Sequence, residues 1–460
     1  MTSHLPNAFD AALTDLLGDG WRTDSDTCRD YGSDSSKCCA PADGVAFPIN
    51  RDQVQMLVNL CREHRVAIVA RGTGTSSTGA VIPYSGGIVM SFERMQCIVA
   101  IHAEDRYAVV EPGVINADLQ AALAPHGLFW PPDPASAGQC TIGGNLACNA
   151  GGPHAVKYGT SRDNILGLVA VTGRGELITV GSATTKDATG YDLTHLLVGS
   201  EGTLALIVEA TLKLAPLPPH RASLRVLYAD VGSAASAVAR IMAQPIAPSM
   251  LEFMDAACIR LARDVGGADL PDAGALLMIE ADGDVDSLPH ALAALQRAAT
   301  GDGLLVLDSA SDPEASTALW EARKALSPAL RSIAPGKINE DVVVPVSRLP
   351  ELVRGIEGLS REFALPIVAF GHAGNGNVHA NILFDPDDAS ENERAHAALP
   401  RLFALTLSLG GTLSGEHGIG TAKRAYMADA FDGPTLATMR AVKQAFDPDG
   451  LLNPGKVLPD

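Results

Sequence analysis

A short predicted strand followed by a turn rich in glycine, serine and threonine, VAIVARGTGTSSTGA at residues 66–80, decides how this chain can fold. Glycines let the backbone approach a ligand closely, and successive N–H groups in such a turn form a concave site for an anion. A pyrophosphate fits this chemistry. A plain surface loop is the alternative, because short motifs of this kind often match by chance.

Two familiar nucleotide-binding patterns do not fit the turn. A Walker loop needs a lysine after its second glycine, and Gly79 is followed by Ala80. The GxGxxG fingerprint of ordinary Rossmann domains needs a glycine where this chain has Ser77. The turn therefore predicts a nucleotide site of another kind.

Two further segments share this composition of small residues. PPDPASAGQCTIGGNLACNAGGPHAVKYG at 131–159 carries two Gly-Gly pairs, and VGSEGTLALIVEATLKL at 198–214 leads from a turn into a predicted pair of strands over 202–216. Small residues permit close approach of a large flat ligand. Taken in order, the three segments resemble the FAD-binding domain of the vanillyl-alcohol oxidase family over residues 40–217.

That resemblance implies a role for each segment. Backbone N–H groups of the first turn would hold the FAD pyrophosphate, residues 132–152 would line the isoalloxazine ring and ribityl chain, and the third segment would lie near the adenine half, while a late asparagine would face the flavin. The FAD-binding residues so implied are Arg71, Gly72, Thr73, Gly74, Thr75, Ser76, Pro132, Ser136, Gly138, Thr141, Gly143, Gly144, Asn145, Asn149, Gly151, Glu201, Gly202, Ile207 and Asn453. Some family members tether FAD through a histidine in the first turn. No histidine occurs between residues 65 and 101, so non-covalent FAD is expected.

The bulk composition bounds the class of protein. A length of 460 residues, with 47% hydrophobic and 19% charged residues, predicts a folded protein of two or more domains. The net charge of −19 argues against binding to nucleic acid or to an anionic membrane surface. The N-terminus lacks the features of a signal peptide, and no apolar run approaches ~18 residues, so we expect a cytoplasmic protein without a membrane span.

The eight cysteines form no paired framework and no CxxC motif, which favours reduced thiols. A redox or metal pair at Cys38-Cys39 is the alternative to ordinary packing.

Three local elements are expected from the sequence pattern: a helix with an apolar stripe over 52–66, a strand over 46–50, and a hairpin over 164–181.

The second half of the chain predicts a different domain. Prolines cluster at 215–220, and strands that alternate with helices follow, which favours an α+β domain with an antiparallel sheet. We therefore expect an α+β protein: a two-part FAD-binding domain at 1–217, a substrate- and metal-binding cap domain at 218–420, and a C-terminal segment at 421–460 that returns to the FAD-binding domain.

Two histidines, His372 and His379, lie seven residues apart in the glycine-rich stretch FGHAGNGNVHANILFDP (370–386). SGEHGIG (414–420) follows downstream. Two imidazoles and one carboxylate make a three-ligand set with open positions, which suits Zn²⁺ best and Fe²⁺ or Mn²⁺ as alternatives. The spacing alone also leaves these histidines open as proton carriers or as ordinary turn residues.

These motifs and the closing DPDGLLNPGK (447–456) resemble FAD-linked D-2-hydroxy-acid dehydrogenases, which include D-lactate and D-2-hydroxyglutarate dehydrogenases. The likeness covers almost the whole chain. It implies a divalent metal on His372, His379 and Glu416, with His417 as the catalytic acid/base and Asn381 on the substrate side. In that chemistry the metal stabilises the substrate alkoxide, His417 takes the hydroxyl proton, and hydride leaves Cα for flavin N5.

The stretch WEARKALSPALRSIAPGKINEDVVVP (320–345) supplies cations for an acidic substrate. An arginine can clamp a carboxylate with two parallel bonds. The family resemblance implies Arg323 as the carboxylate ligand, with Ser327 and Lys337 nearby. A solvated helix face is the alternative, because Arg and Lys are mostly exposed.

Two stretches of the sequence favour different substrates. A second cation at Lys337 would favour a dicarboxylate such as D-2-hydroxyglutarate, and YGSDSSKCCAPADGVAFP (31–48) resembles relatives of that type. KINEDVVVP (337–345) resembles relatives that use lactate or glycolate. D-lactate, oxidised to pyruvate, is narrowly favoured, with D-2-hydroxyglutarate dehydrogenase or the flavin subunit of a glycolate oxidase complex as alternatives.

A non-catalytic flavoprotein for electron transfer is the competing class, but it would have no need of the histidine, glutamate and arginine set. No CxxCH haem motif and no iron–sulfur run occurs. Reduced flavin must therefore pass its electrons to an external cytochrome, electron-transfer flavoprotein or quinone. If the protein forms an oligomer, we expect a homodimer.

Overall fold

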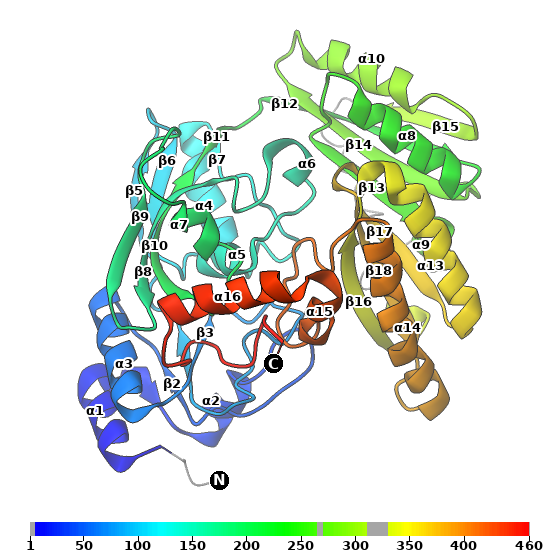
Figure 1. The fold of residues 1–460 in the computed structure, drawn as a ribbon. Helices are drawn as coiled ribbons and strands as arrows, with labels where there is room; N and C mark the ends of the chain where they lie inside the picture. The colour runs from blue at the N-terminus through cyan, green and yellow to red at the C-terminus, as the bar shows by residue number, and fades with distance from the viewer. Residues whose placement is uncertain (1–4, 265–269, 311–329, 460) are drawn as a thin grey trace. The chain divides into compact units, whose positions relative to one another are not determined.

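The computed structural model describes residues 5–264, 270–310 and 330–459 (Figure 1). The chain forms two compact units. The first comprises Met1–Gly152, Gly159–Leu217 and Glu416–Asp460, and the second comprises Pro153–Tyr158 and Pro218–Gly415. Both units mix helices with sheets, as the sequence predicts.

The first unit contains a four-stranded sheet of order β1-β2-β4-β3. Its strands are β1 (Trp21–Arg22), β2 (Gly44–Ala46), β3 (Ile68–Arg71) and β4 (Ile88–Ser91), and β4 runs parallel to both β2 and β3. Helices α1 (Asn7–Leu17) and α3 (Arg51–His64) bury their apolar faces against this sheet in one core. The apolar stripe expected over 52–66 is thus confirmed as α3.

The strand expected over 46–50 is wrong, since β2 ends at Ala46. Pro48 lacks an N–H for a ladder, and the side chain of Asn50 accepts a hydrogen bond from Gln53 N at 2.9 Å to cap α3. The chain therefore turns here instead of extending.

A second, antiparallel sheet of order β5-β6-β10-β8-β9 completes the layers of this unit. Its strands are β5 (Ile98–His102), β6 (Tyr107–Val110), β8 (Ile165–Thr172), β9 (Leu177–Gly181) and β10 (Ala205–Lys213). The hairpin expected over 164–181 is confirmed by the pairing of β8 with β9. The strand pair expected over 202–216 is wrong, because residues 205–213 contain no turn residue and form one strand between β6 and β8.

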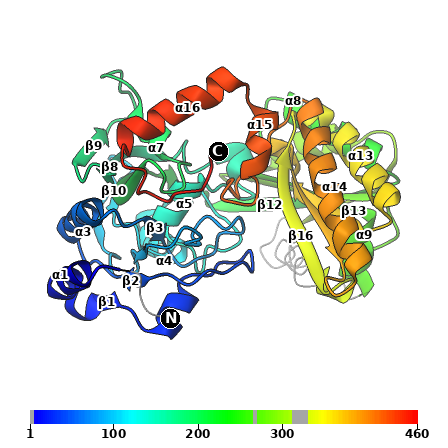
Figure 2. The same cartoon turned by 60° about the horizontal axis from the view of Figure 1, so that its bottom comes forward.

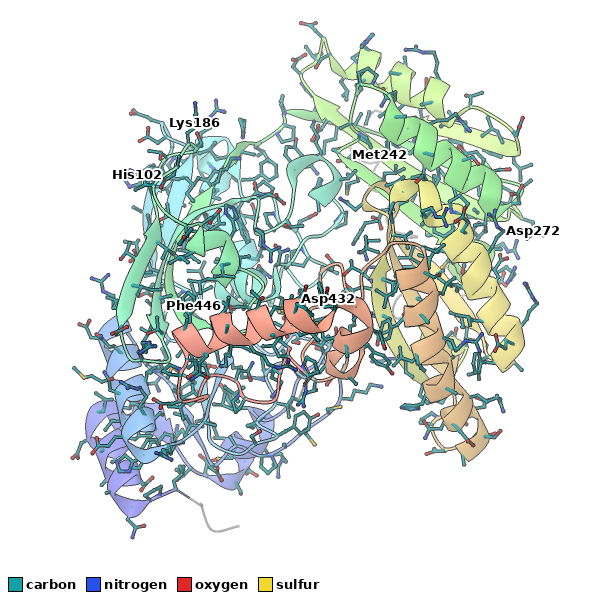
Figure 3. The ribbon with its side chains drawn as sticks, viewed as in Figure 1. His102, Lys186, Met242, Asp272, Asp432 and Phe446 are labelled. Atoms are coloured by element: carbon teal, nitrogen blue, oxygen red, sulfur yellow. The ribbon has the colours of Figure 1, made fainter. Side chains whose placement is uncertain are left out.

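The remaining elements of the first unit are short, except for one helix near the C-terminus. They are α2 (Ser25–Asp30), α4 (Asn116–Leu123), α5 (Ile142–Cys148), α7 (Leu193–Leu197), α15 (Met427–Ala430), α16 (Gly433–Phe446), and the pair β7 (Leu128–Phe129) and β11 (Ala215–Pro216). Asp432, which caps α16 through Thr435 N, and Phe446, which ends it, are labelled in Figure 3.

The second unit is built on one antiparallel sheet of seven strands, in the order β15-β12-β14-β13-β17-β18-β16. The strands are β12 (His220–Tyr228), β13 (Met250–Asp255), β14 (Ala275–Gly283), β15 (Leu304–Ala310), β16 (Gly336–Val343), β17 (Ile367–His372) and β18 (Asn377–Phe384). The antiparallel sheet expected after residue 218 is confirmed.

Helices cover both faces of this sheet. On one face, α9 (Ala256–Asp264) packs on side chains of five strands, among them Met254, Met278 and Phe370. On the other face lies a row of four helices that contact one another in the order α10 (Leu288–Ala299), α8 (Val231–Ala243), α13 (Leu349–Phe363), α14 (Ala389–Ser408), of which α13 and α14 are easily followed in Figure 2. α10 is fixed there because the Tyr228 hydroxyl donates to Ala299 O at 2.6 Å.

A six-residue segment, 153–158, is held on the second unit by charged and polar contacts. It includes the one-turn helix α6 (Ala155–Tyr158). Lys157 forms an ion pair with Asp282, and the Tyr158 hydroxyl donates to the same carboxylate at 2.6 Å. Val156 packs against Gly374, where a Cβ would stand 2.3 Å from Val156 Cγ2. The segment therefore lies against the turn between the two predicted metal histidines.

Candidate active site

The glycine-rich turn of the first unit has a free row of hydrogen-bond donors. Within the described chain, none of the backbone N–H groups of residues 72–77 donates a hydrogen bond. The turn is half-buried, and unpaired buried N–H groups are rare in native proteins unless a ligand or water takes them. Gly74 has a φ of +77°, which favours glycine. These donors fit an anion such as a pyrophosphate.

The second predicted FAD segment meets this turn directly. Thr141 caps α5 by accepting from Gly144 N at 3.1 Å, and its Oγ1 lies 2.4 Å from where a Gly72 Cβ would stand. Thr73 Oγ1 donates to Gln139 O at 2.8 Å. Glycine at position 72 is therefore required for the two segments to lie this close.

The third segment is linked to the other two through backbone and carboxylate contacts. Glu201 N donates to Ala147 O at 2.9 Å, and the buried Glu201 carboxylate accepts from Ile419 N at 2.7 Å and Gly420 N at 2.8 Å. Burial raises the pKa of Glu201, while these N–H groups and two nearby lysines act to lower it. Glu201 thus fixes the segment that carries His417, a contact that the sequence did not indicate; its predicted place near the adenine remains a prediction.

Asn453 joins the C-terminal segment to this region. Its Nδ2 donates to Ala80 O at 2.9 Å and to Glu201 O at 2.7 Å. Its Oδ1 is buried and accepts no hydrogen bond from a described residue. A buried acceptor next to the glycine-rich turn fits the predicted contact with a flavin.

Other predicted FAD residues have structural contacts of their own. Asn145 Oδ1 accepts from Asn116 Nδ2 at 3.0 Å, Asn149 Oδ1 accepts from Arg162 N at 2.9 Å, and Ile207 lies in a hydrophobic core. The roles of the following residues toward FAD likewise stay predictions: Arg71, Thr75, Ser76, Pro132, Ser136, Gly138, Gly143, Gly151 and Gly202.

The two candidate metal histidines stand on neighbouring strands of the second unit. His372 ends β17 and His379 lies in β18, and since Phe370 pairs with His379, both histidines project from the same face of the sheet. Both are buried, and their rings lie 5.3 Å apart in an edge-on arrangement. A turn, Ala373–Asn375, closes between them, and the left-handed Gly376 (φ +69°) ends it.

Glu416 follows Gly415, the last residue of the second unit, by one peptide bond. One ligand atom from each of His372, His379 and Glu416 can be chosen so that all lie within 4.8 Å of one another. Two imidazoles and a carboxylate at this separation are a donor set suited to a divalent metal with open coordination positions. The set therefore fits the predicted ion.

Two buried carboxylates that the sequence did not single out adjoin this set. Glu252, on β13, contacts His372 Nδ1 and stands directly opposite it in the pairing of β13 with β17. Asp341, on β16, accepts from Ser414 Oγ at 3.0 Å and from Gly415 N at 2.9 Å. A charged residue inside the apolar strand SMLEFMD was the one available sequence signal for Glu252.

The predicted substrate residues are only partly within the described chain. Asn381 is fully buried on β18, two residues beyond His379 on the same face, and Lys337 is exposed at the start of β16. Arg323 and Ser327 lie outside the described residues. His417 stands next to Glu416, and its carbonyl accepts from Thr78 Oγ1 at 3.5 Å, beside the glycine-rich turn.

Comparison with known proteins decides the family. The family model for the C-terminal domain of FAD linked oxidases matches residues 217–457, and the model for an FAD binding domain matches residues 42–181. The chain belongs to the FAD-linked oxidase family. This FAD-linked oxidoreductase is 39% identical over 416 residues to the glycolate oxidase subunit GlcD of Bacillus subtilis, which covers 90% of this chain and 88% of that protein.

Two further relatives carry the names that the sequence suggested. The mitochondrial D-lactate dehydrogenase [cytochrome] of Arabidopsis thaliana is 34% identical, over 99% of this chain and 81% of that protein. The D-2-hydroxyglutarate dehydrogenase of Stutzerimonas stutzeri is also 34% identical, over 95% of each. The resemblance to FAD-linked D-2-hydroxy-acid dehydrogenases is thereby confirmed.

The fold agrees with that family. A structure of p-cresol methylhydroxylase with substrate matches with a TM-score of 0.82 at 16% identity, over 100% of this chain and 99% of that one. Alkyldihydroxyacetonephosphate synthase matches with a TM-score of 0.76 at 20% identity, over 99% of this chain and 86% of that one. At such identities the likeness concerns the fold alone, and it confirms the two-part FAD-binding architecture of the vanillyl-alcohol oxidase type.

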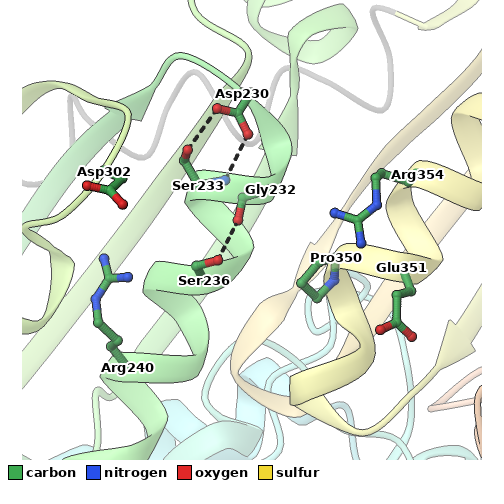
Figure 4. A pocket seen from close by; sticks show the side chains of 9 residues that line it. All are labelled: Asp230, Gly232, Ser233, Ser236, Arg240, Asp302, Pro350, Glu351 and Arg354. Carbon is green, nitrogen blue, oxygen red and sulfur yellow. Dashed lines mark hydrogen bonds between the residues drawn. The ribbon is translucent and has the colours of Figure 1, made fainter.

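A separate concavity of about 510 Å³ lies in the helix layer of the second unit (Figure 4). It is lined by α8 and α13 with side chains that include Asp230, Arg240, Glu351 and Arg354. These helices cover the sheet face opposite to His372 and His379, so this concavity contains none of the predicted site residues.

Three remaining expectations concern the chain as a whole. None of the eight cysteines is in a disulfide, and Cys38 and Cys39 are exposed. Among the described helices, none combines the length and the apolar character needed to cross a bilayer. The expected cytoplasmic location and the homodimer stay predictions.

Proposed function

We propose that this FAD-linked oxidoreductase is a metal-assisted dehydrogenase that oxidises a short D-2-hydroxy acid, with D-lactate as the favoured substrate, to the 2-oxo acid. The observation that carries the proposal is the convergence of His372, His379 and Glu416 within 4.8 Å. Two buried histidines and a half-buried glutamate at this separation, with the buried Asn381 on the same strand as His379, suit an ion that binds a hydroxy acid.

Each residue of the set has a role in the proposal. His372, His379 and Glu416 would hold a divalent ion, for which Zn²⁺ is the first choice, and the N–H groups of residues 72–77 would hold the FAD pyrophosphate without a covalent tether. When bound, the ion would act as a Lewis acid on the substrate hydroxyl, and FAD would accept the hydride from Cα. Asn381 presents a buried Oδ1 that accepts no hydrogen bond from a described residue, and so can accept one from substrate.

His417 takes the hydroxyl proton, because an imidazole nitrogen can accept a proton from a bound substrate near neutral pH. The substrate thus loses one hydride and one proton, and the products are a 2-oxo acid and reduced flavin. Arg323, Ser327 and Lys337 are proposed to bind the substrate carboxylate. An external cytochrome, electron-transfer flavoprotein or quinone would take up the electrons.

Anaerobic reduction of the purified protein tests this function. D-lactate should bleach the flavin absorbance near 450 nm, L-lactate should not, and a chelator should slow the reaction until Zn²⁺ is returned. D-2-hydroxyglutarate and glycolate belong in the same series. If no member of the series bleaches the flavin of a metal-loaded protein, the proposed enzymatic function is wrong.

A second candidate function is the flavin subunit of a glycolate-oxidising complex. It is favoured by the 39% identity to GlcD, which is the highest among the relatives named above. In that case glycolate should reduce the flavin faster than D-lactate at equal concentration. Faster reduction by D-lactate would exclude this candidate.

A further inference from the structure

Glu252 is a buried carboxylate whose place in the sheet is tied to His372. It is 1% exposed and lies in the middle of β13. Burial of a carboxylate is costly unless hydrogen bonds or opposite charge stabilise it. Its Oε1 contacts His372 Nδ1, and the register sets the two residues directly opposite each other. Because Nδ1 contacts Glu252, a metal held by His372 would be bound through Nε2.

Asp341 lies opposite His379 in the sheet, as Glu252 lies opposite His372. It is fully buried on β16 and pairs directly with His379 on β18. Its carboxylate oxygens accept from Ser414 Oγ at 3.0 and 3.1 Å, and Oδ2 also accepts from Gly415 N at 2.9 Å. Glu416 is the next residue, so Asp341 fixes the backbone from which the third ligand projects.

Glu252 and Asp341 therefore contact a candidate ligand or its backbone, but they are not candidate ligands themselves. The donor set of the described chain comprises His372, His379 and Glu416, without Glu252 or Asp341. Outer carboxylates of this kind orient a histidine or a loop, and their loss typically lowers metal affinity by about 10–100-fold.

We propose that Glu252 and Asp341 are positioning residues of the metal site: Glu252 orients the His372 ring, and Asp341 holds the turn that presents Glu416. This rests on the proposed function, since it assumes that the three ligands bind a divalent ion. Glu252→Gln keeps the size of the side chain but removes its charge, and Asp341→Asn removes one of the two acceptor oxygens that hold residues 414–415.

The test measures metal affinity instead of turnover. The FAD-loaded protein is stripped of metal and titrated with Zn²⁺ against a chromophoric chelator, and with Co²⁺, whose visible absorbance reports the geometry of its ligands. Asp255→Asn is the matched control, because Asp255 lies on the same strand as Glu252 and also bonds to β17, through Ala369 N at 2.6 Å, but does not contact a ligand histidine.

We expect Zn²⁺ affinity to fall about 10–100-fold in Glu252→Gln and in Asp341→Asn. Flavin content should be unchanged, the Co²⁺ spectrum should change in both, and Asp255→Asn should behave as wild type. If Glu252→Gln does not fold, Glu252→Asp, which keeps the charge but shortens the side chain, should still bind Zn²⁺ more weakly than wild type.

Two results would overturn the proposal in distinguishable ways. Wild-type affinity in Glu252→Gln and Asp341→Asn, or an equal loss in Asp255→Asn, would show that these carboxylates do not position the ligands, and would leave the metal site itself standing. A wild-type protein that binds neither Zn²⁺ nor Co²⁺ would remove the proposed metal set, and with it any positioning role.

Discussion

Replacement of Gly374 by alanine should destabilise the second unit, but the same replacement should cost little in a protein that already carries Val156→Ala. Gly374 has no left-handed φ, so alanine alone would be expected to stabilise by about 0.4–1 kcal/mol. Its Cβ would, however, stand 2.3 Å from Val156 Cγ2, far inside the ~3.5–4.0 Å of an ordinary carbon contact. Valine is stiff at χ1, so the methyl cannot easily rotate away.

The net loss for Gly374→Ala should be about 1–3 kcal/mol, the usual cost of overpacking a well-packed site. Val156→Ala should cost about 1 kcal/mol, since two half-buried methyl groups are removed. The double variant should then lie near Val156→Ala alone, which corresponds to a coupling of about 1–3 kcal/mol. Urea unfolding of all four proteins measures it, and Zn²⁺ content should follow the same order because this turn joins the two histidines.

Gly358→Ala is a useful control, because a Cβ at this position in α13 meets no heavy atom within 4 Å. It should be neutral or slightly stabilising. Losses from Gly374→Ala and Val156→Ala that simply add, within about 0.5 kcal/mol, would mean that the 153–158 segment does not pack on this turn.

Three other outcomes are expected. His417→Ala should keep its flavin and metal while kcat falls about 10²–10⁴-fold in steady-state assays; loss of metal would mean that the ligands are wrongly assigned. Gly74→Ala should purify with less flavin, seen in the ratio of absorbance at 450 and 280 nm, because its φ of +77° disfavours a side chain and its Cβ would stand 2.2 Å from the Arg71 guanidinium; full flavin occupancy would count against the anion site. Burial lowers the pKa of Lys456 to about 8, so between pH 8 and ~10.4 the unfolded chain binds more protons than the folded one and stability rises with pH. Relative to Lys456→Met, the wild type should gain up to about 3 kcal/mol of unfolding free energy from pH 7 to 10, and parallel pH profiles would contradict this.

Local patterns in the sequence were enough to predict much of the fold. The apolar stripe of α3, the hairpin of β8 and β9 and the glycine-rich turn after β3 all depend on residues close in the chain. The two wrong predictions have local causes as well. Pro48 ends the chain's extended stretch after β2, and residues 205–213, which contain no turn residue, form the single long strand β10.

The contacts behind the ligands could not be predicted in this way. Glu252 meets His372 across 120 residues, and Glu201 meets Ile419 across 218. Such pairs depend on which strands or turns become neighbours. Glu252 belongs to no motif, and the segment that contains Glu201 indicated FAD binding and not a contact with residues 419–420. The two candidate histidine ligands were recognisable because a glycine-rich turn brings His372 and His379 together over a short span.

The path of the backbone has a consequence for any attempt to take the protein apart. The chain passes between the two units after residues 152, 158, 217 and 415, so neither unit is a continuous stretch. A gene cut at residue 217 would separate the first unit from Asn453 and the second from the 153–158 segment. One protease nick at residue 217 should leave both fragments bound. Grafting the second unit onto another flavoprotein would require splice points after residues 152, 158 and 415 as well as after 217.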